Sequence, residues 1–302
     1  MFLIVLLYAL LAGTFTFGKM ILAYTQPIFV VGMRMSISGA ILLLYHVVTN
    51  RQQLLHIKKQ HIVPFLKATI LTIYIPYVLR SWGLVHLSST KACLIYNCGP
   101  FLSYFFSYIF YNEAARLKKI IGLCIGFIGL LPLLITSSLT TGQQHGLYFL
   151  PELAILIAVS CMSYGWLIIH QLINQGQYSP SMTNGIIMFV GGIAALATSF
   201  IVENPDYYIT ELVPFSTLLV LIIVVSNLLC HNLYGALLRI YTPTMLSFTS
   251  FLSPVFTAFY GWLFMNEQIP WYFYIASLII FSGLFLFYSD ELRQQQQIRK
   301  AA

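Results

Sequence analysis

The chain has 302 residues, of which 59% are hydrophobic and only 8% are charged, and its formal net charge is +7. A soluble domain carries about 25% charged residues and needs a charged surface, so this composition excludes a soluble protein. Disorder is excluded as well, because it requires low hydrophobicity. The remaining class is an integral membrane protein, for which we expect membrane lipid and not nucleic acid as a partner.

Ten segments are long and apolar enough to cross a bilayer as helices of about 20 residues. In chain order they are Phe2–Leu22, Pro27–Val48, Val63–His86, Ala92–Asn112, Leu117–Thr136, Glu152–Leu172, Met182–Val202, Pro214–Leu238, Pro243–Phe264 and Trp271–Ser289. Continuous apolar runs of this length favour helices over the alternating strands of about ten residues in a membrane barrel. We therefore predict an all-α integral membrane protein with ten transmembrane helices.

The basic residues predict the orientation of these spans, because lysine and arginine favour the cytoplasmic ends of membrane helices. With the N-terminus inside, 11 of the 15 basic residues fall in cytoplasmic segments and only Lys91 falls in an outer segment. The sequence thus predicts cytoplasmic N- and C-termini, with residues 290–302 as a cytoplasmic tail, in the inner membrane of a bacterium.

The two halves of the chain resemble each other. At a spacing of 154 residues, the matches are Pro100 with Pro254, Glu113 with Glu267, and Tyr24-Thr25 with Tyr178-Ser179. At a spacing of 147, Phe17-Gly18 matches Tyr164-Gly165, and a seven-residue insertion after the sixth span reconciles the two values. The predicted units, residues 1–136 and 152–289, contain five spans each. An odd number of spans makes the second unit enter the membrane from the opposite side, which is the 5+5 inverted repeat of many secondary transporters.

A proline lies early in the fourth and ninth spans, a glutamate closes each of these spans, and a helix with glycines follows. With the early basic residue of the second span, the residues concerned are Pro100, Pro254, Glu113, Glu267, Gly122, Gly126, Gly129, Gly283 and Arg34. With these motifs the chain resembles the drug/metabolite transporter superfamily, in its EamA-type branch. The resemblance implies a ten-helix bundle with a central cavity and the export or exchange of small metabolites. Met188 stands where Arg34 would map in the second unit, so the two halves differ there.

Three basic residues, Lys19, Arg34 and Arg80, lie inside predicted spans with no acid at their depth. Ionisable residues inside a membrane are costly and are candidates for function. If the three face one cavity, they would attract a carboxylate or phosphate group of a substrate. The alternative is that their side chains reach the outer headgroups. For Arg34 a third interpretation is that it caps a broken neighbouring helix.

Polar and aromatic residues in the middle of spans are further candidates for a substrate-binding cavity. They are Tyr74, Tyr77, Trp82, Tyr96, Asn97, Tyr164, Trp166, Asn227 and His231. With the basic residues, such a lining would suit an amino acid or nucleoside-like derivative such as S-adenosylmethionine, which some members of the superfamily are taken to carry. The alternatives are a membrane-interface belt for the rings and an interhelical hydrogen bond for the histidine.

Four residues at repeat-equivalent positions are candidate hinges or gates: Pro100, Pro254, Gly18 and Gly165. A proline removes a backbone donor and weakens a helix, although fixed bends for packing would use the same residues. The pair Gly122 and Gly126 allows a close helix approach, either inside the bundle or in a homodimer.

The sequence favours a secondary transporter, either an exchanger or a facilitator, that moves a polar, carboxylate-bearing or zwitterionic metabolite by alternating access. Ion coupling through a midplane carboxylate is disfavoured, because Glu113, Glu152 and Glu267 lie at span ends. Alternatives are an exporter of drugs or amphipathic organic cations, a channel, and a membrane-embedded enzyme or scaffold. No catalytic motif, metal-site spacing or cofactor motif is found, so neither an enzyme nor a cofactor is predicted.

Overall fold

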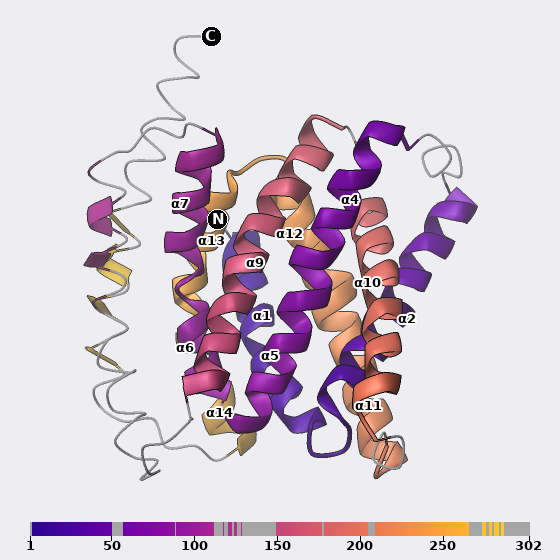
Figure 1. Ribbon diagram of the computed structural model, residues 1–302. Helices are drawn as coiled ribbons and strands as arrows, with labels where there is room; N and C mark the ends of the chain where they lie inside the picture. Colours follow the sequence, from indigo (N-terminus) through magenta and orange to yellow (C-terminus); the bar gives the residue numbers. More distant parts are fainter. Residues whose placement is uncertain are drawn as a thin grey trace.

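The computed structural model describes residues 2–49, 57–87, 89–111, 149–176, 178–204 and 209–265, with scattered residues between 117 and 128 and between 274 and 286. The regular structure of these residues is helical, and Figure 1 shows the helices side by side in one bundle. The elements are α1 (Phe2–Ile21), α2 (Pro27–Thr49), η1 (Lys59–His61), α4 (Ile62–Ala68), η2 (Thr69–Tyr74), α5 (Ile75–His86), α6 (Ser89–Tyr96), α7 (Gly99–Tyr111), α9 (Phe149–Asn174), α10 (Pro180–Val202), α11 (Leu212–Ile222), η4 (Ile223–Cys230), α12 (His231–Leu237), α13 (Pro243–Thr249), η5 (Ser250–Leu252) and α14 (Ser253–Met265).

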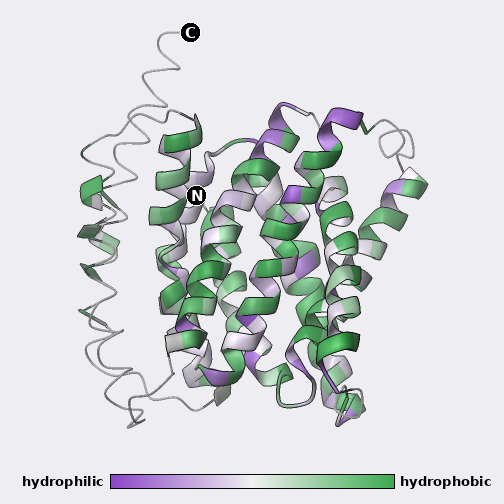
Figure 2. Cartoon of the chain, in the orientation of Figure 1, coloured by the Kyte–Doolittle hydropathy of each residue, from purple (hydrophilic) through white to green (hydrophobic). Residues whose placement is uncertain are grey.

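Six helices among the described residues are long and apolar enough to cross a membrane. They are Phe2–Ile21, Pro27–Thr49, Lys59–His86, Leu150–Asn174, Pro180–Val202 and Leu212–Leu237. They coincide with the first, second, third, sixth, seventh and eighth predicted spans. Hydrophobic residues cover most of the helical surface in Figure 2, and hydrophilic residues lie mainly at the helix ends. The fifth and tenth predicted spans fall mostly outside the described residues.

The fourth and ninth predicted spans are each interrupted. Asn97 and Cys98 separate α6 from α7, and the 3-10 turn η5 separates α13 from α14. Pro100 and Pro254 occupy the second position of α7 and α14, where the missing N–H of proline is not needed. Ser253, the residue before Pro254, keeps helical dihedral angles (φ −59°, ψ −42°), so this proline does not end the preceding helical backbone. The sequence predicted a single bent helix in each place. In the fourth span the structure has two helices separated by a turn, whereas the ninth span is a continuous helical segment with a 3-10 turn at η5.

These irregularities recur at one spacing in the two halves. Helices α7 and α14 begin 154 residues apart, as do α6 and α13 and the π-helical segments η2 and η4. Pro76, two residues after η2, cannot donate a backbone hydrogen bond and would clash with the carbonyl four residues earlier, which accounts for the wider turn there. Cys230 stands at the corresponding place in η4, so a proline is not the cause in the second half.

Hydrogen bonds between helices distinguish the two ends of the bundle. At one end, Glu203 accepts backbone N–H bonds from Ile28 and Phe29 at 2.7 and 2.8 Å, and so caps the start of α2. At the other end, the Tyr178 hydroxyl is hydrogen-bonded to His61 Nδ1 at 2.9 Å. We call these the Glu203 end and the Tyr178 end.

The equivalent helices of the two halves run in opposite directions (Figure 1). Helix α1 ends at the Glu203 end, where Thr210 N donates to Tyr24 O at 3.1 Å. Helix α5 ends there too, because Lys19 near the end of α1 donates to Leu84 O. Helix α9 begins at that same end, since Ile155 belongs to one buried cluster with Leu84. Helices α2 and α10 also run in opposite directions, because α2 begins beside Glu203 and α10 ends at Glu203.

Helices α2 and α10 form the most extensive helix–helix contact in the described part of the chain. Glycines let their backbones meet: a Cβ added at Gly39 would lie 2.3 Å from Phe189 N, and one added at Gly192 would lie 2.4 Å from Ser36 N. Small residues allow such close approach of membrane helices. This pair therefore forms a tightly packed spine for the bundle.

We predict that Gly39→Ala lowers the free energy of unfolding by about 1–3 kcal/mol, the usual cost of overpacking, because the added methyl group meets the backbone of α10. Thermal denaturation of the purified protein in detergent measures the change. Gly18→Ala is the control, since its added methyl group meets only Leu84 Cδ1 at 3.7 Å. Equal denaturation temperatures for the two variants would contradict the close packing of α2 on α10.

Candidate functional site

A cavity lies between the two halves of the bundle. Side chains from α1, α5, α9 and α12 line it, together with residues from both interrupted spans. Six of the candidates from the sequence line this cavity: Tyr77, Arg80, Tyr96, Asn97, Trp166 and His231. Broken helices place backbone polar groups at a membrane midplane, and transporters use them to build substrate sites at repeat interfaces.

Positive charge is concentrated around one ring. The guanidinium of Arg80 lies 4.9 Å from the ring centres of Tyr77 and Phe15 and 5.9 Å from that of Tyr96. The guanidinium of Arg34, on α2, lies 4.6 Å from the same Tyr77 ring. Cation–π contacts of this kind stabilise a cation by roughly 0.5–2 kcal/mol, which is well below the cost of removing it from water.

These two charges have no compensating partner in the described part of the chain. Arg34 and Arg80 are only 3% and 5% exposed. Arg34 Nε and Nη2 and Arg80 Nε have no hydrogen-bond partner, and neither side chain forms an ion pair with a described carboxylate. Buried charges are normally paired with an opposite charge. Two buried arginines that lack such a partner, beside a cavity, are therefore suited to binding an anionic group.

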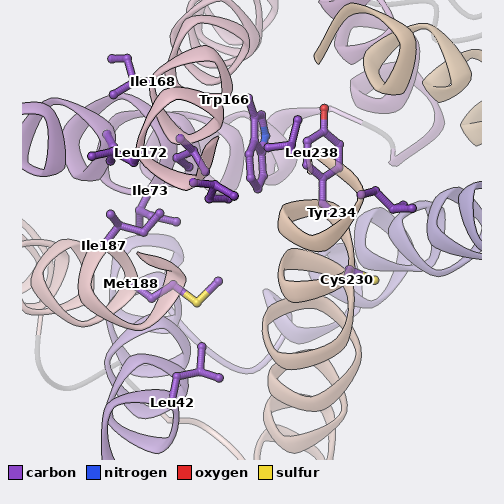
Figure 3. Close-up of a cluster of buried hydrophobic side chains, with 14 of the residues drawn as sticks. Leu42, Ile73, Trp166, Ile168, Leu172, Ile187, Met188, Cys230, Tyr234 and Leu238 are labelled. Atoms are coloured by element: carbon purple, nitrogen blue, oxygen red, sulfur yellow. The ribbon is translucent and has the colours of Figure 1, made fainter. Parts of the chain in front are cut away.

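A second polar group faces Tyr77 from the other half of the bundle. The Tyr77 hydroxyl is hydrogen-bonded to His231 Nε2, on α12. The indole of Trp166 lies 5.5 Å from the His231 ring and 4.1 Å from the Tyr234 ring, measured between ring centres. Figure 3 shows the indole beside the Tyr234 ring. The cavity thus has broad aromatic walls that can hold a planar group.

Neutral hydrogen-bonding groups lie where the interrupted spans meet. Asn97 Nδ2 donates to Cys93 O at 2.7 Å, and Ser250 Oγ donates to Asn97 Oδ1 at 3.4 Å. Further hydroxyl groups on the lining belong to Ser103, Ser163, Ser247 and Ser253. Aspartate and glutamate are absent from the described residues that line the cavity. The arrangement can bind an anionic group, a flat ring and several hydrogen-bonding groups at once.

Arg34 and five other predicted cavity residues do not line this cavity. Two of these five, Lys19 and Asn227, have clear polar contacts elsewhere. Lys19 donates to the carbonyl groups of Leu84 and Val85, and so caps the end of α5 in a manner that favours a positive charge. Asn227 Nδ2 donates to Arg34 O at 3.2 Å and to Ser38 Oγ at 2.9 Å, which ties η4 to α2.

Two aromatic candidates lie on the outside of the cavity as well. Trp82 is 37% exposed and packs on His86, with ring centres 5.0 Å apart. Tyr164 packs against Phe106 and Phe110 of α7, with ring centres 5.4 and 5.0 Å apart. Tyr74 likewise bonds to Thr198 at 2.7 Å instead of facing the cavity.

The candidate hinges differ in their surroundings. Pro100 and Pro254 begin the second helices of the interrupted spans. A Cβ added at Gly165 would lie 2.3 Å from Thr72 Oγ1, so this glycine allows α9 to approach η2. Gly18 is less crowded. The motif residues Glu113, Glu267, Gly126 and Gly129 lie outside the described residues.

Sequence reasoning missed several cavity residues, above all Tyr8, Phe15 and Tyr234. Tyr8 donates to Leu246 O at 2.5 Å and joins α1 to α13. Such residues give no distinctive pattern, because tyrosine and phenylalanine occur throughout these spans. The spacing of 154 between the candidates Tyr77 and His231 matches the spacing of the two halves, and it could have marked these two residues as a contact.

Three comparisons place the chain among known proteins. A model of the EamA-like transporter family matches residues 1–135 and 150–289. The chain is 32% identical to an S-adenosylmethionine/S-adenosylhomocysteine transporter of Chlamydia muridarum, covering 97% of this chain and 92% of that one. It is also 32% identical to the transporter of the same description from Chlamydia trachomatis serovar L2, covering 97% and 90%. A crystal structure with 14% identity superposes with a TM-score of 0.75 over 94% of this chain and 93% of the other, so the two share a fold.

We predict that Trp166→Ala destabilises the fold by about 3–5 kcal/mol, because it empties the space between His231 and Tyr234. Trp82→Ala removes an indole at the outer surface and should cost less than about 1 kcal/mol. Thermal denaturation in detergent compares the two variants. A larger loss for Trp82→Ala would show that the rings are oriented differently.

Proposed function

This chain belongs to the EamA-like transporter family, and from that premise we propose that it carries S-adenosylmethionine and S-adenosylhomocysteine across the membrane by alternating access. It is an integral membrane transporter and not an enzyme. We propose further that the protein lies in the inner membrane of a bacterium and that it works by exchange or facilitated diffusion. The observation that carries it is the pair of uncompensated arginines at the aromatic cavity.

The chemistry of these metabolites matches the cavity group by group. Both have an amino acid carboxylate, an adenine and a ribose. The guanidinium of Arg80 can pair with the carboxylate, preferably through two parallel hydrogen bonds. Aromatic walls such as Trp166 suit the adenine, and the serine hydroxyls suit the ribose and the purine nitrogens. The two chlamydial relatives, similar over nearly the whole chain, support the same substrates.

We propose ten spans arranged as a 5+5 inverted repeat, with units 1–136 and 152–289 and a tail 290–302. The 154-residue spacing of α6, α7 and η2 with α13, α14 and η4 supports it, as do the opposed directions of α1 and α9. The distribution of lysine and arginine supports cytoplasmic N- and C-termini. In such a repeat, the two units exchange conformations and expose one central site to each side in turn. The interruptions before Pro100 and Pro254 are then the flexible points of the moving spans.

The absence of acids from the described cavity lining supports exchange or facilitated diffusion over carboxylate-based ion coupling. Counterflow in liposomes that contain the purified protein tests the class of function. A carrier preloaded with unlabelled S-adenosylhomocysteine should accumulate labelled S-adenosylmethionine with saturation and without converting it. Non-saturable flux would indicate a channel, and chemical conversion would indicate an enzyme. Preference for hydrophobic cations without a carboxylate would indicate a drug exporter.

We predict that Arg80→Gln and Arg34→Gln each weaken the apparent affinity for S-adenosylhomocysteine by about 1–3 kcal/mol, the size of a lost charged hydrogen bond. Arg80→Gln removes a direct contact with the carboxylate, and Arg34→Gln removes the second positive charge beside Tyr77. Saturation curves of uptake into liposomes measure the effect.

Arg239→Gln is the matched control, because Arg239 is exposed in the turn after α12 and does not line the cavity. It should leave the affinity unchanged. Wild-type affinity in both cavity variants would contradict the proposed role of the buried arginines.

A further inference from the structure

The hydrogen bond between Tyr77 and His231 joins two residues that the repeat makes equivalent. They are 154 positions apart, which is also the spacing of η2 from η4 and of α7 from α14. Two units related by a two-fold axis place equivalent residues on opposite sides of it at equal distances. A residue can therefore touch its own equivalent only on the axis itself.

Two other contacts lie close to the same axis. Ser250 donates to Asn97 at a separation of 153 positions, where the two helix interruptions face each other. In the crossing of α2 and α10, Gly39 meets Phe189 and Gly192 meets Ser36. The sequence separations of these two contacts are 150 and 156, and their mean of 153 is within one residue of the repeat spacing of 154. The crossing of α2 and α10 is therefore itself nearly symmetric.

An axial contact has a special place in a transport cycle of this kind. If the two units exchange conformations, a contact between residues i and j in one state becomes a contact between their equivalents in the other state. For an axial pair, the equivalents are the same two residues. The contact therefore maps onto itself and is present in both states, whereas an off-axis contact is exchanged for a different one.

We propose that Tyr77 and His231 are positioning residues whose hydrogen bond persists in the inward- and outward-facing states. The inference rests on the proposed function and its inverted repeat. In this structure Arg34 and Arg80 both stack on the Tyr77 ring, so the axial contact lies beside the buried positive charge.

Lys19 supplies the contrasting, off-axis contact. It binds Leu84 O and Val85 O at the Glu203 end. The equivalents of Lys19 and Leu84 are Trp166 and Leu238, and an indole cannot replace an ammonium group that binds two carbonyl oxygens. This contact therefore stabilises one state only.

The test compares the apparent affinity for S-adenosylhomocysteine at the two membrane faces, measured in right-side-out and inside-out vesicles. Apparent affinity at each face scales with the fraction of carrier open to that face, so the ratio of the two affinities reports the equilibrium between states. Tyr77→Phe, which keeps the ring, should weaken both affinities by the same factor and leave their ratio within twofold of wild type. His231→Gln should behave alike. Lys19→Met should shift the ratio by about tenfold, as expected for loss of a charged hydrogen bond.

Each result decides the matter. A ratio shifted by Tyr77→Phe or His231→Gln as much as by Lys19→Met would overturn the axial role, and so would a ratio that none of the three variants moves. Wild-type vesicles that carry neither S-adenosylmethionine nor S-adenosylhomocysteine would overturn the proposed function, and this inference with it. If wild-type vesicles carry these metabolites, the three variants test the axial contact alone.

Discussion

The rest of this structure depends on two guanidinium groups that are buried inside the bundle with no described carboxylate beside them. Burying an unpaired ion costs several kcal/mol even after relaxation. Arg34 and Arg80 recover part of that cost by stacking on Tyr77, whose hydroxyl is in turn fixed by His231. The remaining electrostatic deficit is one that an anionic ligand can remove. An anionic ligand that supplies the missing negative charge therefore has a physical reason to bind beside these arginines, inside the bundle.

The helices around this site divide into packed and interrupted elements. Glycines bring the backbones of α2 and α10 together, and Glu203 closes one end of that pair. By contrast, the fourth and ninth spans and the π-helical segments depart from regular α-helix close to the cavity. Helix irregularity inside a membrane is tolerated only in protein or at a polar cavity, and here it occurs at positions 154 residues apart in the two halves of the chain. A tight spine beside interrupted spans is consistent with motion that leaves the axis in place.

Much of this organisation could be predicted from the sequence. Span length and hydrophobicity are local properties, so six predicted spans match apolar helices of the structure. Arg34 and Arg80 stand out because charge is so rare in these spans. The orientation of each side chain around its helix could not be predicted, since it depends on how neighbouring helices cross. Trp82 and Trp166 are both in mid-span, yet one is at the outer surface and the other lines the cavity. Lys19 was likewise ambiguous, because the carbonyl groups that it caps belong to another helix.

The central claim is that Arg80, with the second positive charge of Arg34 beside it, binds the carboxylate of the substrate. Ligand-induced thermal stabilisation of the purified protein tests it most directly, because a ligand that binds the folded state raises the denaturation temperature. S-adenosylhomocysteine should stabilise the wild type clearly, and methylthioadenosine, which keeps the nucleoside and lacks the amino acid, should stabilise it much less. In Arg80→Gln the difference between the two ligands should vanish. Equal stabilisation of the wild type by both ligands would contradict the account.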